Sequence, residues 1–148
     1  MRVVVDTNEL LRMAAGGERS QLAQHWRLHH FDLLMSFATL SELRTVLARP
    51  KIQRYVPAGA ADPFIALVEQ RAIFVEPDLS APKCRDPQDS ALIATSVGGR
   101  ADCLVSADPD IVDDAVLCTA LLRRGVRVMR AKEFLTLLES NQTAPPAA

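Results

Sequence analysis

The segment from Cys84 to Asp110 constrains the fold most, because it encodes a helix, a glycine stop, a buried strand and an acid in that order. The helix begins at Asp86, an N-cap residue type, and Asp89 falls in its first turn, where an acid favours free N–H groups. Gly98-Gly99 ends it. Cys103–Val105 is a short apolar run typical of a strand inside a parallel sheet. The segment therefore predicts one helix–strand unit of an α/β domain.

The rest of the chain repeats this alternation. Apolar runs predict strands at residues 2–6, 31–35, 72–75 and 126–129, in addition to 103–105. Further helices are expected up to Gly16-Gly17, over 20–30, from Ser36 to Pro50, over 60–70, up to Gly125 and over 131–139. Alternating strands and helices predict a three-layer α/β/α sandwich around a central parallel sheet of about five strands.

Size and composition indicate one domain. We expect residues 1–139 to form it and residues 140–148, which are polar and rich in Ala and Pro, to be a disordered tail. The net charge of -1 excludes a protein that coats nucleic acid by charge alone. Three cysteines without C-x-x-C spacing indicate free thiols in a reducing cytoplasm. The chain shows neither a signal peptide nor an apolar run of ~20 residues, so we expect a cytoplasmic protein without membrane association.

Four acidic residues are expected to converge at one edge of this sheet. Asp6 and Asp108 follow strands directly, and the carboxyl ends of parallel strands meet at one edge, where ligands bind. Asp89 heads a helix that packs over the sheet, and Glu42 lies in the second turn of the helix after the second strand. Taken singly, these acids also suit strand-end turns, the helix dipole or an exposed helix face.

A carboxylate cluster predicts a bound metal ion. Clustered carboxylates repel one another unless protons or cations neutralise them. Hard divalent ions such as Mg²⁺ or Mn²⁺ prefer oxygen ligands and accept phosphate oxygens in their remaining positions. Phosphodiester hydrolysis follows from this chemistry more directly than acyl transfer. The three histidines lie within six residues of one another, and the spacing of His25 and His29 indicates a solvated helix face rather than a zinc site.

Four motifs in the correct order resemble the PIN-domain family of metal-dependent ribonucleases, in particular the VapC-like toxins of toxin–antitoxin pairs. The motifs are VVVDTN, SFATLSELRTVLARPKI, CRDPQDSALIATSVGGRADCLVSADPDI and GVRVMRAKEFLTLL. The resemblance covers nearly the whole chain. It places the family's acids at Asp6, Glu42, Asp89 and Asp108, and its Ser/Thr position at Ser106. Glu9 departs from the pattern, because the family usually has an apolar residue there.

The resemblance implies an endoribonuclease that uses Mg²⁺ or Mn²⁺ and forms a homodimer inhibited by an antitoxin. Asp6 and Asp108 would hold the principal metal ion, and Asp89 and Glu42 would complete the catalytic set. Further residues have expected roles: Asp110 and Asp86 as accessory metal ligands, Asn8 and Ser106 in orienting ligands or substrate, and Arg44 and Arg49 on RNA phosphates.

Two other functions stay open from the sequence. A PIN fold could keep its acids and act only by binding RNA or a partner protein. A phosphatase of the haloacid dehalogenase type also begins with a strand that ends in Asp, but it normally needs a second acid two residues later. Asn8 occupies that position, which disfavours the phosphatase.

Overall fold

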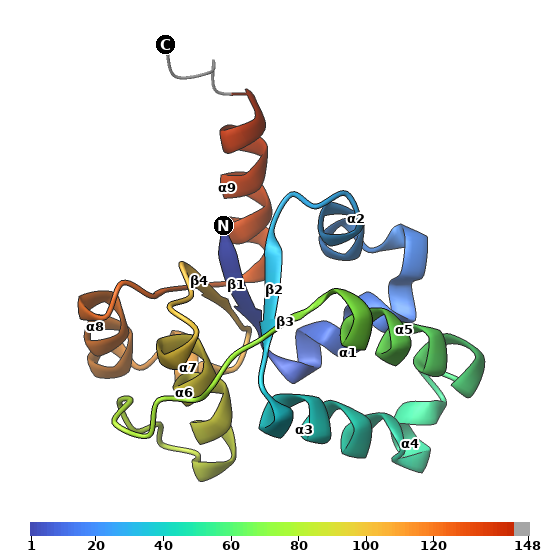
Figure 1. Ribbon diagram of the computed structural model, residues 1–148, viewed down its shortest axis with the longest axis horizontal. Coiled ribbons are helices and arrows are strands. Elements are labelled where there is room, and N and C mark those ends of the chain that lie inside the picture. Colours follow the sequence, from blue (N-terminus) through green and yellow to red (C-terminus); the bar gives the residue numbers. More distant parts are fainter. Residues whose placement is uncertain (144–148) are drawn as a thin grey trace.

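The computed structural model describes residues 1–143. A five-stranded sheet lies at its centre, in the order β3-β2-β1-β4-β5, and the pairing of each strand with its neighbour is parallel. The strands are β1 (Arg2–Val5), β2 (Asp32–Met35), β3 (Ile73–Phe74), β4 (Cys103–Val105) and β5 (Arg127–Met129). β1 runs downward from the N label in Figure 1, so the carboxyl ends of the strands face the lower edge of the sheet.

Helices cover both faces of the sheet, which confirms the predicted α/β/α class (Figure 1). One face carries α1 (Thr7–Gly16), α2 (Gln21–Arg27), α3 (Phe37–Leu47), α5 (Ala58–Arg71) and α9 (Ala131–Thr143). The other carries α6 (Ser90–Gly98), α7 (Pro109–Val112) and α8 (Ala115–Arg123). Short helices complete the chain: η1 (Gly17–Arg19), α4 (Pro50–Gln53) and η2 (Pro87–Asp89). Among residues 1–143, every helix is too short or too polar to span a bilayer.

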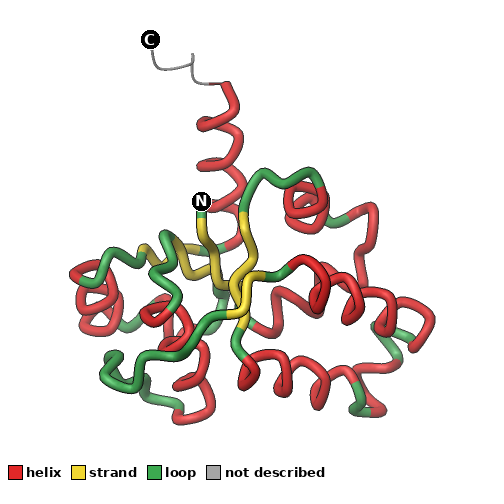
Figure 2. Tube along the Cα trace, in the orientation of Figure 1, coloured by secondary structure: helices red, strands yellow, loops and turns green. Residues whose placement is uncertain are grey.

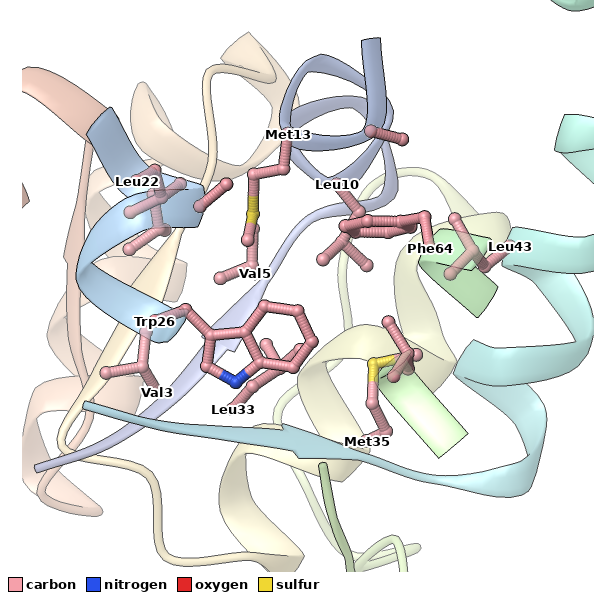
Figure 3. Packing of buried hydrophobic residues seen from close by; sticks show 14 of the residues in the cluster. Val3, Val5, Leu10, Met13, Leu22, Trp26, Leu33, Met35, Leu43 and Phe64 are labelled. Carbon is pink, nitrogen blue, oxygen red and sulfur yellow. The ribbon is translucent and has the colours of Figure 1, made fainter. Parts of the chain in front are cut away.

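Strand periodicity explains why the sheet is buried on both faces. Side chains alternate along a strand, so Val3 and Val5 of β1 join one apolar core while Val4 joins the other. The first core lies under α1 and α2, where Trp26 packs edge-on against Phe64 at 6.2 Å between ring centroids (Figure 3). The second core joins β4 to α6 and α8. Near-continuous apolar strands are required where both faces are covered.

The connection from β3 to η2 is a long loop that returns along α6 (green in Figure 2). Gly98 allows this close approach, because a Cβ there would lie 2.7 Å from the Asp78 nitrogen and would clash with the Glu76 carbonyl oxygen. The Asp78 N–H donates to the Ala94 carbonyl at 2.9 Å. The loop is thus fixed against α6, the helix that Asp89 directly precedes.

The ends of two helices differ from the sequence predictions. The helix expected over 20–30 ends at Arg27, since His29 takes a positive φ of 61°. His25 therefore contacts His30, with 2.8 Å between their Nδ1 atoms, and not His29. α9 continues four residues past the expected end at Glu139, and residues 144–148 of the tail lie outside the described residues.

Candidate metal centre

Ser106 ties the ends of β1 and β4 together at the centre of the acid-bearing edge. It is fully buried and follows β4 directly. Its Oγ donates to Oδ2 of Asp6 at 2.6 Å and accepts from the backbone N–H of Asp108 at 3.0 Å. Asp6 is only 7% exposed and makes no capping hydrogen bond to α1, so its carboxylate is left for the site. Two acids 102 residues apart in sequence are thereby held beside one hydroxyl.

Asp89 reaches this pair from the other side of the edge. It ends η2 and stands immediately before α6. Burial, followed by the nearby carboxyl of Asp108, raises the pKa of Asp89 to about 7, and Asp6 and Asp86 act in the same direction. In its protonated form Asp89 also shares a hydrogen bond with Asp108. These carboxyls are therefore close enough that one of them keeps its proton near neutral pH.

Glu42 approaches the same edge from α3. Burial raises its pKa, and the charges of Asp6 and Asp86 add to the effect. A hydrogen bond from the Thr7 hydroxyl and the charge of Arg49 oppose it. Thr7 is buried, and the sequence interpretation gave it no role at the site. Its position directly after the strand-end acid was the available signal.

The accessory acids are engaged in local turns. Asp86 Oδ1 accepts from the Gln88 N–H at 2.9 Å and caps η2, as its residue type predicted. Asp108 Oδ1 accepts from the Asp110 N–H at 2.9 Å, and the same carboxyl interacts with that of Asp89. Asp110 is half-buried in the first turn of α7.

The polar and basic residues predicted around the acids fall into different places. Asn8 is exposed in the first turn of α1. Arg49 lies within electrostatic range of Glu42. Arg44 instead forms an ion pair with Glu69 of α5. Glu9, the residue that departs from the motif, is buried and paired with Arg12.

The donor set suits a hard divalent cation. Within residues 1–143, no three His, Cys, Asp or Glu side chains are grouped closely enough to enclose an ion. The carboxyls do form a linked series, however, in which Asp89 senses Asp108 and Asp6, and Glu42 senses Asp6. The mutual repulsion of these carboxyls, which raises the pKa of Asp89 to about 7, is the kind that a bound cation relieves. All of these donors are carboxylate oxygens, the ligands that Mg²⁺ and Mn²⁺ accept.

Comparison with known families agrees with this geometry. A family model described as PIN domain matches residues 2–110, which include every one of the acids above. The chain belongs to the PIN-domain family. Members of this family are typically nucleases, and membership indicates nuclease activity and RNA binding in general terms. Comparison with curated protein sequences finds no match.

Proposed function

We propose that the protein is an endoribonuclease that hydrolyses RNA phosphodiester bonds with Mg²⁺ or Mn²⁺. The observation that carries this is the Asp6–Ser106–Asp108 connection, with Asp89 close enough to Asp108 to retain a proton. Repulsion between neighbouring carboxylates destabilises the folded protein, and a cation that binds between them relieves it. The PIN-domain match supports the same activity.

The acids would hold the metal ion and the neighbouring hydroxyls would orient them. Asp6, Asp89 and Asp108 are the proposed ligands, and Ser106 fixes the carboxylate plane of Asp6. Glu42, held by Thr7, completes the set from α3. A divalent ion bound there would act as a Lewis acid on the phosphate and stabilise the attacking and leaving oxygens. Asp86 and Asp110 are proposed as accessory ligands, and Asn8 and Arg49 as substrate contacts.

Cleavage of labelled RNA by the purified protein tests this function. We expect cleavage with Mg²⁺ or Mn²⁺, none with excess EDTA, and loss of at least a hundredfold in Asp6→Asn or Asp108→Asn. Asp32→Asn is the matched control, because Asp32 is exposed at the opposite end of β2. Full activity in Asp6→Asn or in EDTA would overturn the proposal. RNA binding without cleavage would favour the silent PIN fold, and turnover of p-nitrophenyl phosphate instead of RNA would favour the phosphatase.

The resemblance to VapC-like toxins supports a second level of the proposal: a homodimeric toxin that an antitoxin inhibits in the cytoplasm. Induced expression should then arrest growth, and Asp6→Asn should not. Growth that is equally slow for both proteins, at equal expression, would contradict a toxic ribonuclease.

A further inference from the structure

Two phenylalanine side chains lie together on the surface where β2 and β3 end. Phe37 is the first residue of α3, and Phe74 ends β3, level with Met35 in the sheet. Their ring centroids are 5.7 Å apart, with the planes inclined at 31°. Phe37 is 78% exposed and Phe74 37%. Large apolar side chains are normally a main source of burial energy, yet the described part of the chain leaves Phe37 uncovered.

This aromatic pair lies at the same edge as the acids. All the strands are parallel, so the ends of β2 and β3 face the same way as the ends of β1 and β4. Phe37 and Glu42 are five residues apart on α3, a separation of about 7.5 Å along a helix axis at about 1.5 Å per residue. The aromatic pair therefore shares α3 with one of the acids of the candidate metal centre.

A cavity of about 360 Å³ lies between residues next to the aromatic pair and residues next to Asp89. Its lining includes Ala38, which follows Phe37, and Ser90, which follows Asp89. The long loop supplies Pro77, Leu79 and the exposed Lys83. The ion pairs between described residues do not include Lys83. The surface beside the acids thus combines a mainly apolar cavity, an aromatic face and the exposed charge of Lys83. The one carboxylate in the cavity lining, Asp78, is paired with Arg124.

We propose, on the basis of the ribonuclease function above, that Phe37 and Phe74 form a stacking platform for an unpaired base of single-stranded RNA, with Lys83 near its phosphate. Every base has a π-face, so aromatic stacking binds single strands with little sequence preference. In a duplex those faces are already stacked. The net charge of -1 gives little general attraction for phosphate, so stacking supplies affinity that charge does not.

Binding of a labelled twelve-nucleotide RNA that contains 2-aminopurine tests the platform. The full chain is used in EDTA at low salt, so that the RNA stays intact. Phe37→Ala should weaken binding about five- to 150-fold, the equivalent of about 1–3 kcal/mol for one stacked base, and should abolish the quenching of 2-aminopurine. Phe37→Trp should keep both. Tyr55→Ala, which removes a 75% exposed aromatic side chain beyond α4, should change neither.

Two outcomes would overturn the platform. One is equal affinity of Phe37→Ala and the wild type for single-stranded RNA, with unaltered thermal unfolding. The other is a wild-type dimer that Phe37→Ala converts to monomer without loss of RNA affinity, which would assign the pair to a contact between copies. The ribonuclease function is separable from both. Metal-dependent cleavage with an unaffected KM in Phe37→Ala refutes only the platform. If the wild type does not cleave RNA but Phe37→Ala loses the quenching of 2-aminopurine, only the nuclease is refuted.

Discussion

Asp89→Asn should stabilise the metal-free protein, because the acid cluster destabilises its own fold. The pKa of Asp89 is raised from 3.8 to about 7, first by burial and then by Asp108. The folded state therefore keeps a proton that the unfolded state loses, and the free energy of unfolding falls as pH rises from about 4 to about 7. Asparagine carries no charge, and its amide can donate the hydrogen bond that protonated Asp89 gives Asp108. The substitution removes the penalty without removing the contact.

The size of the effect follows from the shift. About three pKa units at about 1.36 kcal/mol each set a ceiling near 4 kcal/mol. Asp89 is only half-buried, so screening by solvent reduces this to roughly 1–2 kcal/mol. For a domain of this length that corresponds to a rise of about 3–8 °C in Tm.

Thermal unfolding of the wild type and Asp89→Asn in EDTA at pH 5 and pH 8 measures this gain in stability. The advantage of Asp89→Asn should be full at pH 8 and about two-fifths as large at pH 5, because pH 5 lies only about 1.2 of the roughly 3.2 pH units above the unfolded-state pKa of 3.8. Asp32→Asn should show no such dependence. Added Mn²⁺ should reverse the ranking, since an ion that binds only the folded wild type stabilises it. A Tm for Asp89→Asn at or below the wild-type value at pH 8 in EDTA would refute the reasoning.

Other substitutions test the support of the site and of the loop beside it. Ser106→Ala leaves Asp6 and the Asp108 N–H without a buried partner. The free energy of unfolding should therefore fall by about 1–3 kcal/mol, and the rate of RNA cleavage by about 10–100-fold. The control is Ser96→Ala, which removes a buried hydroxyl bonded within α6 and should leave cleavage unchanged in the same assay. Gly98→Ala should destabilise by about 1–3 kcal/mol in urea unfolding, because its Cβ meets the 76–78 backbone. Gly59 lies in α5 with open space around it, so Gly59→Ala should instead stabilise the protein by about 0.5–1 kcal/mol. Equal effects of Gly98→Ala and Gly59→Ala on the free energy of unfolding would contradict the close approach of the 76–78 backbone to Gly98.

Patterns that repeat at short range were sufficient to predict the sheet. Apolar runs such as Val3–Val5 and Cys103–Val105 are buried on both faces, and that burial is encoded residue by residue. Helix ends were less accurate. The turn at His29 depends on a positive φ stabilised by tertiary contacts, including the guanidinium of Arg71 at 3.0 Å from its Nδ1. No local pattern specifies such a contact.

The acids could be named from the sequence, but their connections could not. Strand ends and a family resemblance pointed to Asp6 and Asp108, whereas the Ser106 hydroxyl that joins them depends on the pairing of β1 with β4. The Phe37–Phe74 pair was not anticipated either. It forms only because β3 pairs with β2 in one register, across 37 residues of intervening chain.

Anomalous diffraction from crystals grown with Mn²⁺ measures the central claim most directly. We expect one or two ions bound to carboxylate oxygens of Asp6, Asp89 and Asp108, with Glu42 nearby, and no such peak in crystals of Asp108→Asn. Manganese bound only elsewhere on the surface, with these carboxylates free of it at saturating concentration, would contradict the account.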